Sequence, residues 1–343
     1  AKEEDELIFE EKDESFSVGI GLSSDEKFFL ISSSEHVTSE IYYFPADQKK
    51  PEPKLLIKRE QEITYGIDSW GDYFYMHTNK NAEDFKIVRC RRDNLNKWED
   101  FVPARNKTLI GGFTILKEWM IRSEVRNALS KLFVRNLKTN KEEELIFSDE
   151  KIYMPVCTLV QRNRNTDLVH LSYASPKTPS RSYLYNLKTK EKQLVKEQEI
   201  PSGHNPDNYI VERLECDARN GVKVPVTIIR HKKTKLDGSA HVLLYSYGAY
   251  GNSIGLGFSS PHLSLIDRDI IWVDAHVRGG LELGMHHWRD GKMLNKKNTF
   301  EDYIASAKYL IKNRYTSNKK IIGMGGSAGG LLMGAAVNQA PEL

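Results

Sequence analysis

The sequence predicts two regions of different fold class: a partial β-propeller over residues 1–204 and an α/β domain over residues 205–343. Three observations carry this prediction. Alternating strands recur at regular intervals in the first region, strand-like apolar runs flank an amphipathic helix in the second, and a glycine-rich turn joins the last strand of the second region to its last helix.

The repeat in the first region has spacings of 45, 46 and 49 residues between equivalent strand starts. These starts lie at Phe28, Tyr73, Trp119 and Leu168. A polar turn, Asn136–Lys141, also returns 50 residues later as Asn186–Glu191. Repeats of this length, each made of about four strands, are typical of propeller blades. We therefore expect about four blades, which either close a ring or belong to a larger one. A non-repeating β-sandwich is the alternative, because the repeats are degenerate.

The second region begins with a predicted hairpin. Two strand-like segments, Tyr209–Ala218 and Val222–His231, flank Arg219-Asn220-Gly221, whose Asn-Gly step favours a tight turn. Two runs dominated by apolar residues follow, His241–Tyr245 and Ile270–Ala275, as expected for strands buried on both faces.

An amphipathic helix is predicted next, from apolar residues that recur at helical spacing. Its buried face should contain Phe300, Tyr303, Ile304, Ala307, Leu310 and Ile311. Thr299 and Asp302 suit its first turn, where a side-chain acceptor and a negative charge are favourable. Strands alternating with helices in this way indicate a doubly wound sheet.

The glycine-rich turn contains Gly-x-Ser-x-Gly, from Gly325 to Gly329, between the strand-like Lys320-Ile321-Ile322 and the helix-like Leu331–Val337. A strand, sharp turn and helix in this order is the context of a nucleophile elbow, which projects a serine hydroxyl. Its glycines allow close approach of the backbone, and the helix start offers free N–H groups to an oxyanion. The alternative is a turn that holds a phosphate or has no ligand.

In α/β-hydrolases with this elbow, the catalytic acid and histidine follow the serine in the chain. All ten histidines here precede Ser327, and residues 328–343 contain neither His nor Asp. We therefore expect an α/β-hydrolase domain truncated after the nucleophile helix, with its Asp and His beyond Leu343. Alone, such a chain should be inactive, and poorly soluble or partly unfolded, because a strand edge and an apolar helix face are left unpaired.

Composition excludes several classes of protein. The net charge of +3 comes from interspersed acidic and basic residues, which argues against a nucleic-acid surface. No apolar stretch is long enough for a transmembrane helix, so no membrane partner is expected. Cys90, Cys157 and Cys216 lack metal spacing and are odd in number, which favours a reducing, cytoplasmic location.

Several motifs of the second region resemble the prolyl oligopeptidase family of serine peptidases, and within it the oligopeptidase B group. They are Tyr245-Ser246-Tyr247-Gly248-Ala249-Tyr250-Gly251, His276-Val277-Arg278-Gly279-Gly280-Leu281-Glu282-Leu283-Gly284, Lys297–Tyr303, Gly325–Gly330 and Asn338–Leu343. The match is dense from Tyr245 onward and looser in the propeller.

The resemblance implies that Ser327 attacks the peptide carbonyl, while the Ala328 N–H and the Tyr247 hydroxyl hold the oxyanion. A fixed phenol is a competent donor, worth about 3 kcal/mol to the transition state. The alternative for Tyr247 is aromatic packing at a turn.

The resemblance also implies that Glu282 and Arg278 lie at the substrate pocket, where a buried carboxylate would favour Arg or Lys before the scissile bond. Proline-specific relatives carry the same glutamate, so it does not settle specificity. Glu282 paired with Arg278, or satisfied within its loop, is the alternative. Leu281 stands where a small residue is expected.

Metal binding by His276, His286 and His287 is not expected, because adjacent histidines rarely bind one ion and no Asp, Glu or Cys partner has suitable spacing. The expected function is a serine oligopeptidase that cuts short peptides after Arg or Lys and needs no cofactor. Two alternatives stay open: a proline-specific or acyl-peptide hydrolase of the same family, and a catalytically incompetent propeller–hydrolase scaffold. The sequence says nothing of oligomeric state.

Overall fold

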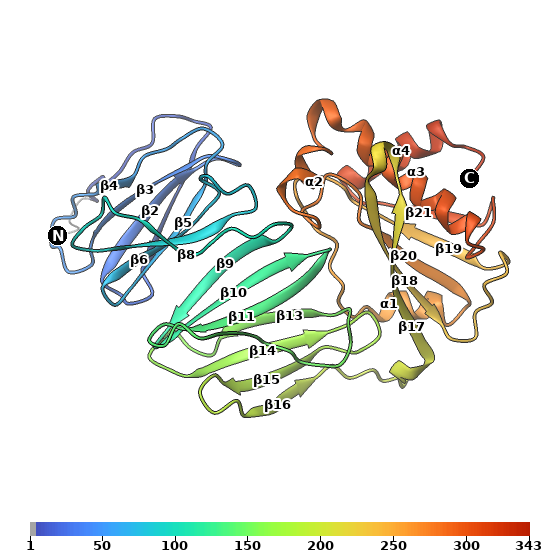
Figure 1. Ribbon diagram of the computed structural model, residues 1–343, viewed down its shortest axis with the longest axis horizontal. Helices are drawn as coiled ribbons and strands as arrows, with labels where there is room; N and C mark the ends of the chain where they lie inside the picture. The colour runs from blue at the N-terminus through green and yellow to red at the C-terminus, as the bar shows by residue number, and fades with distance from the viewer. Residues whose placement is uncertain (1–4) are drawn as a thin grey trace.

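The computed structural model describes residues 5–343, so the first four residues of the predicted 1–204 region lie outside it. Four small β-sheets precede a larger sheet that carries the helices (Figure 1). The last strand of the four sheets ends at Glu197 and the first strand of the larger sheet begins at Tyr209. The domain boundary at residues 204 and 205 stays a prediction.

Each of the four sheets has four antiparallel strands in chain order. The strands are β1 (Ser17–Leu22), β2 (Phe28–Ser34), β3 (Ser39–Pro45) and β4 (Lys54–Ile57); β5 (Tyr65–Trp70), β6 (Tyr73–Thr78), β7 (Lys86–Arg91) and β8 (Glu99–Val102); β9 (Leu109–Leu116), β10 (Trp119–Arg126), β11 (Leu129–Asn136) and β12 (Glu142–Glu144); and β13 (Met154–Leu159), β14 (Leu168–Ala174), β15 (Arg181–Asn186) and β16 (Lys192–Glu197). The predicted blades are confirmed, and the β-sandwich alternative is wrong.

The repeat positions mark the same place in every blade, because each predicted strand start is the first residue of the second strand of its sheet. The repeated turn also has one geometry. The Asn136 side chain accepts hydrogen bonds from the Lys138 and Thr139 N–H groups at 3.0 and 2.9 Å. The Asn186 side chain does the same at the next blade, at 2.9 and 3.0 Å. Asparagine recurs because its amide oxygen satisfies the backbone of the turn.

Successive blades pack face to face through buried apolar clusters, for example Ile121 and Val134 of the third blade against Val169 and Leu171 of the fourth. The first and fourth blades lie apart in Figure 1, with the others between them. Within the described residues, the four blades therefore form an open arc, and Val18 and Ile20 of β1 are exposed.

The larger sheet has the strand order β17-β18-β20-β19-β21. Its strands are β17 (Tyr209–Asp217), β18 (Lys223–His231), β19 (His241–Tyr245), β20 (Ile270–Ala275) and β21 (Ile321–Met324). Strands β20, β19 and β21 are parallel, and the β17–β18 hairpin adds antiparallel strands at one edge. Asn220 turns this hairpin with a φ of 63°, as the Asn-Gly step predicts.

Helices cover both faces of this sheet, as the alternating strands and helices predict. They are α1 (Ser260–Ile266), α2 (Met285–Arg289), α3 (Lys297–Lys312) and α4 (Ala328–Gln339), with short 3₁₀ helices at Pro206–Asn208, Arg219–Gly221 and Met293–Asn295. One face packs against α3 and α4 through Leu244, Val273 and Leu310. The other packs against α1 through Trp272 and Leu263. No helix in residues 5–343 has the length and apolar character needed to cross a membrane.

The prediction that Thr299 and Asp302 suit the first turn of the amphipathic helix is wrong for Asp302. Helix α3 begins at Lys297, so Thr299 lies in its first turn and Asp302 in its second, and neither side chain caps the helix. Both side chains are fully buried and bind the preceding loop instead: the Thr299 hydroxyl donates to the Arg278 carbonyl at 2.7 Å, and Asp302 binds the Arg278 side chain. Tertiary partners therefore determine these two positions.

The propeller contacts the α/β domain through its β5–β8 and β9–β12 blades. Asp84 accepts a hydrogen bond from the Met285 N–H at 2.8 Å, at the start of α2. At the tip of the β10–β11 hairpin, the Ala128 N–H donates to the Glu282 carbonyl at 2.8 Å. The Ala128 carbonyl accepts from Arg213 of β17 at 2.9 Å. The second region's glycine-rich loop is thus fastened directly to the propeller.

Candidate active site

Ser327 lies on the sharp turn between β21 and α4, as predicted. Its side chain is exposed, and its backbone has φ 51° and ψ −119°, outside the regions that a non-glycine residue normally adopts. Such a conformation costs about 1–3 kcal/mol and persists only where the surroundings impose it. A reactive serine is the usual reason for this strain at a strand-to-helix turn.

Close backbone contacts impose the turn. A Cβ atom on Gly325 would lie 2.6 Å from the Gly329 carbonyl oxygen and 3.0 Å from that of Ser246, the residue after β19. A Cβ on Gly329 would also lie 3.0 Å from the Ser246 oxygen. Gly326, by contrast, has open space where a Cβ would be. Only part of the glycine run is therefore required by packing.

This difference gives a prediction with its own control. Gly325→Ala should lower the free energy of unfolding by about 1–3 kcal/mol, because the new methyl group overpacks rigid backbone. Gly326→Ala should be neutral or slightly stabilising. The midpoints of urea unfolding of the two variants measure this, and equal midpoints would contradict the packing argument.

Tyr247 and Ala328 lie beside Ser327. Ala328 is the first residue of α4, where an N–H group has no acceptor in a preceding turn. Tyr247 follows the end of β19, and its Cα is 3.5 Å from the position of a Cβ on Gly329. The loop after β19 and the start of α4 are therefore in direct contact. Within the described chain, the Ser327 hydroxyl has no hydrogen bond to a histidine.

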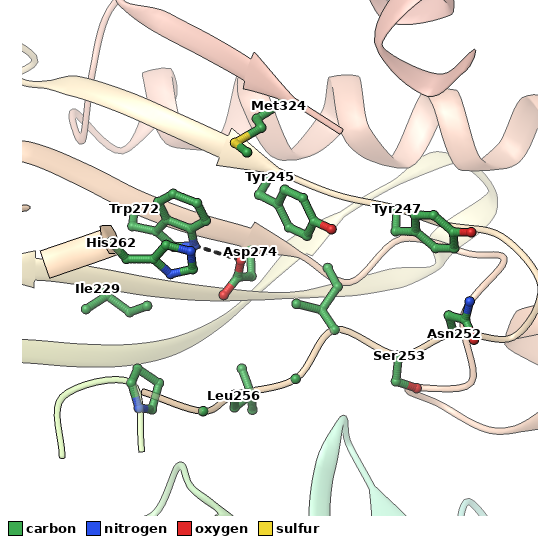
Figure 2. A pocket seen from close by; sticks show the side chains of 14 residues that line it. Ile229, Tyr245, Tyr247, Asn252, Ser253, Leu256, His262, Trp272, Asp274 and Met324 are labelled. Atoms are coloured by element: carbon green, nitrogen blue, oxygen red, sulfur yellow. Dashed lines mark hydrogen bonds between the residues drawn. The ribbon is translucent and has the colours of Figure 1, made fainter. Parts of the chain in front are cut away.

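A cavity of about 520 Å³ opens next to Tyr247 (Figure 2). One wall is the sheet and α1, the opposite wall is the segment 252–257, and Pro176 of the fourth blade also lines it. Met324, three residues before Ser327, lies at the edge near the elbow. The cavity therefore extends from the serine turn to the propeller.

One row of paired residues across the sheet runs to this cavity, which its members Asp274, Tyr245 and Met324 line. Strand pairing aligns Arg213 with Thr227, Thr227 with Asp274, Asp274 with Tyr245, and Tyr245 with Met324. Directly paired residues share one face of a sheet, here the face that also holds α1. The row lies at the carboxyl ends of β19, β20 and β21, where α/β sheets bind ligands.

Asp274 is the carboxylate that lines the cavity. It is 6% exposed, and its Oδ1 accepts a hydrogen bond from the Trp272 indole N–H at 2.8 Å. Burial raises the pKa of Asp274 to about 7, an effect only partly opposed by the Trp272 hydrogen bond and the charge of Arg213. A carboxyl group that titrates near neutrality in a cleft is typical of functional sites.

Glu282 does not line the cavity. It is 2% exposed and lies behind the 252–257 wall, where its Oε1 accepts from the Ile254 N–H at 3.0 Å. His276 Nδ1 is 3.5 Å from the same oxygen. Burial acts to raise the pKa of Glu282, but the neighbouring His276 holds it below its ordinary value. Contact between Glu282 and substrate stays a prediction, and the observed contacts fit support of the wall.

Arg278 is also internal. Its Nε and Nη2 atoms donate to Asp302 at 2.8 and 2.6 Å, and its backbone N–H donates to the same carboxylate at 2.9 Å. The alternative in which Glu282 pairs with Arg278 is therefore wrong. Arg278 is 3% exposed, so a role in binding substrate stays a prediction, and its contacts instead fix the loop that runs to Glu282.

The loop accommodates Leu281 without distortion, because the leucine packs against Gly251, where a Cβ would lie 3.2 Å away. His276 and His287 are buried and both act on the charge of Glu282, whereas His286 is exposed on α2. Among residues 5–343, no group of three or more His, Cys, Asp or Glu side chains is arranged to hold a metal ion.

Sequence reasoning missed Asp274, Asp302 and Arg213. Asp274 was included in an apolar run, yet a carboxylate inside a strand buried on both faces is itself a signal, since such residues are rarely buried without a function or partner. Asp302 and Arg213 gave no such signal, because their roles depend on partners distant in the chain.

The fold and the site define a class: a β-propeller joined to an α/β domain with a nucleophile elbow. The model of the prolyl oligopeptidase N-terminal beta-propeller domain matches residues 1–198, and that of the prolyl oligopeptidase family matches residues 257–343. This chain belongs to the prolyl oligopeptidase family.

Curated relatives include dipeptidyl aminopeptidase BI from Pseudoxanthomonas mexicana, 38% identical over 99% of this chain and 47% of the relative. Protease 2 from Moraxella lacunata is 36% identical over 99% of this chain and 49% of the relative. Among solved structures, oligopeptidase B from Trypanosoma brucei, with covalently bound antipain, matches with a TM-score of 0.91 and 31% identity over 96% of this chain and 48% of that one. The chain thus spans about half the length of the relatives it matches.

Proposed function

We propose that this protein is a serine peptidase that hydrolyses short peptides after Arg or Lys through an acyl-enzyme. The observation that carries the proposal is the strained Ser327 at the β21–α4 turn, where Gly329 of the same turn packs against Ser246 and Tyr247. The printed names of the relatives, an aminopeptidase, a protease and an oligopeptidase, support the same reaction class.

In this proposal the Ser327 Oγ attacks the peptide carbonyl carbon. The Ala328 N–H and the Tyr247 hydroxyl donate to the oxygen that becomes negative, which such donors stabilise most in the transition state. The amine product then leaves, and water releases the acyl group from the serine. We assign no residue of the described chain as the base that takes the serine proton.

The remaining parts of the proposal follow from the surroundings of the cavity. Pro176 of the fourth blade lies at its wall, so we propose that the propeller restricts entry to short peptides. No organic cofactor or metal is required for acyl transfer by serine. We propose the cytoplasm as the compartment, because Cys90, Cys157 and Cys216 are all unpaired.

The test is steady-state cleavage of fluorogenic peptides that bear Arg, Lys or Pro before the reporter, with the protein as encoded by its gene and its Ser327→Ala variant. Cleavage after Arg or Lys that disappears in the variant supports the proposal. Cleavage only after Pro would be consistent with the peptidase reaction of the family but would overturn the preference for Arg or Lys. No cleavage of any peptide would favour a binding or scaffold role.

A further inference from the structure

We propose that Asp274 forms a cation-binding subsite in the cavity beside Tyr247, which receives a positively charged group of the substrate peptide. The group is an Arg or Lys side chain or the free α-amino group, which share the same chemistry. The inference rests on the proposed peptidase function and identifies the substrate chemistry of that site.

The first argument is geometric. Asp274 lies in the middle of the cross-strand row, paired with Thr227 on one side and Tyr245 on the other. Its side chain lines the cavity beside Trp272 (Figure 2). Its Oδ1 is held by Trp272, and its Oδ2 has no donor within residues 5–343. The carboxylate is therefore fixed in orientation by one oxygen and free to accept a hydrogen bond from a ligand with the other.

The second argument is the composition of the walls. The rings of Tyr245, Tyr247 and Trp272 line the same cavity as the carboxylate. The Trp272 ring stacks with Tyr245 at 6.2 Å and with His262 of α1 at 3.4 Å between ring centroids. Aromatic faces attract cations through their quadrupoles, and more strongly where water is excluded. A carboxylate among aromatic rings is suited to an ammonium or guanidinium group.

The third argument is charge balance. Among residues 5–343, the cation that acts on Asp274 is Arg213, whose Nη1 and Nη2 donate to the Thr227 hydroxyl at 2.7 Å and the Ala128 carbonyl at 2.9 Å. The described residues give Arg213 no ion pair with Asp274, and Glu282 competes for its charge. Burial lowers the pKa of His276 to about 4, so this histidine is neutral at pH 7. Glu282, Asp274 and Glu215 all act on the charge of Arg213, so Asp274 has no cation of its own within residues 5–343, and we expect a ligand cation to supply one.

The position of the other nearby carboxylate favours Asp274 as the receptor in this cavity. Glu282 is turned to the rear of the 252–257 wall, whereas Asp274 lines the cavity. A buried carboxylate that lacks a partner is costly, and a structure that keeps one at a ligand cavity gains from it when a cation binds.

The test compares peptides that differ only in charge, using the gene product and its Asp274→Asn variant. A lysine at each of the three positions before the scissile bond is replaced in turn by norleucine, and the N-terminus is either free or acetylated. For the one position that is recognised, Asp274→Asn should raise KM about 10–100-fold, as expected for loss of a hydrogen bond to a charged group, with kcat retained. For the norleucine peptide, KM should be unchanged.

The two sources of charge separate in this panel. A lysine-to-norleucine change that matters only when Asp274 is present assigns the subsite to a side chain, and an effect of acetylation that depends on Asp274 assigns it to the α-amino group. Asp237→Asn is the matched control, because Asp237 is exposed and bonds only the neighbouring Ser239 N–H in a surface turn. Equal effects of Asp274→Asn on charged and neutral peptides would overturn the proposal.

Binding to the inactive protein separates this inference from the proposed function. Calorimetry with the lysine, norleucine and N-acetylated peptides on Ser327→Ala, with and without Asp274→Asn, needs no catalysis. A preference for the lysine side chain or for the free N-terminus that Asp274→Asn removes supports the subsite even if no peptide is cleaved. Equal affinity for all three peptides overturns the subsite even if cleavage depends on Ser327.

A pH series adds a second readout. Because the pKa of Asp274 is raised to about 7, the ionised form that attracts a cation accumulates as pH rises through 7. Affinity for the lysine peptide should therefore increase from pH 6 to pH 8 and become flat in Asp274→Asn. His262, Tyr245, Tyr247 and Arg213 face the same carboxylate and remain in the variant, so a slope that persists there would assign the titration to one of them and count against Asp274.

The variant should remain folded, which keeps the test interpretable. Because the pKa of this carboxyl group is higher in the folded than in the unfolded protein, the free energy of unfolding falls as pH rises from the unfolded-state pKa toward 7. Asp274→Asn removes that loss and should melt at the same or a higher temperature at pH 8. A lower melting temperature at this pH would show that Asp274 has a structural cation partner, contrary to the proposal.

Discussion

Ser327→Ala is expected to lower kcat of the gene product by about 10⁵-fold or more, the loss typical of removing a serine nucleophile. The reason is local: the Ser327 hydroxyl is the exposed group on a backbone of φ 51°, and no other hydroxyl occupies this turn. Single-turnover cleavage of a fluorogenic peptide measures the effect. Activity that survives the substitution would exclude Ser327 as the nucleophile.

Tyr247→Phe tests the geometry of the same turn. Loss of one oxyanion donor should lower kcat about 10²–10³-fold with little change in KM, because the donor acts mainly in the transition state. Combined with Ser327→Ala, it should cost little more, since residues of one catalytic unit are not additive. Tyr250→Phe is the matched control: Tyr250 lies in the same loop but is exposed and lines a different cavity. If both phenylalanine variants behave alike, Tyr247 only packs at the turn.

The second large effect is expected at Asp302, outside the cavity. Asp302→Ala should lower the free energy of unfolding by about 3–5 kcal/mol, because it leaves the Arg278 guanidinium buried without its partner. The Arg278 and Asp302 side chains are 4% and 0% exposed, so water cannot replace the carboxylate. The midpoint of urea unfolding measures the loss.

The neighbouring residue supplies the control. Glu301 also pairs with an arginine, Arg219, at 2.6 Å, but the Arg219 side chain is 67% exposed. Glu301→Ala should therefore change the free energy of unfolding by less than about 1 kcal/mol. Replacing both Arg278 and Asp302 by apolar residues of similar volume should restore part of the loss. A small effect of Asp302→Ala would mean that the loop before α2 holds Arg278 in place without it.

Patterns that depend on neighbours in the chain were readable from the sequence. Strand starts such as Phe28 and Trp119 repeat because each blade buries the same positions of its second strand. The Asn220 turn and the Ser327 turn follow from backbone conformations that few residue types support. These features are local, so propensity and spacing are sufficient to predict them.

Features that depend on partners distant in the chain could not be predicted from the sequence. Thr299 and Asp302 have the residue types of a helix start, yet their partner is the Arg278 loop, and α3 begins earlier. Substrate contact by Glu282 stays a prediction, whereas Asp274, which lines the cavity, is placed opposite Tyr245 by strand pairing. The register of the sheet determines which face Asp274 occupies, and a shift of one residue would turn its side chain to the other face.

The hairpin tip at Ala128 links the propeller to the wall of the cavity, through the Glu282 carbonyl and Arg213. By thermodynamic reciprocity, a peptide that binds more tightly with the tip docked must strengthen the docking by the same factor. In that case a substitution at the tip changes the affinity for the peptide, and a substitution in the cavity changes the docking of the tip.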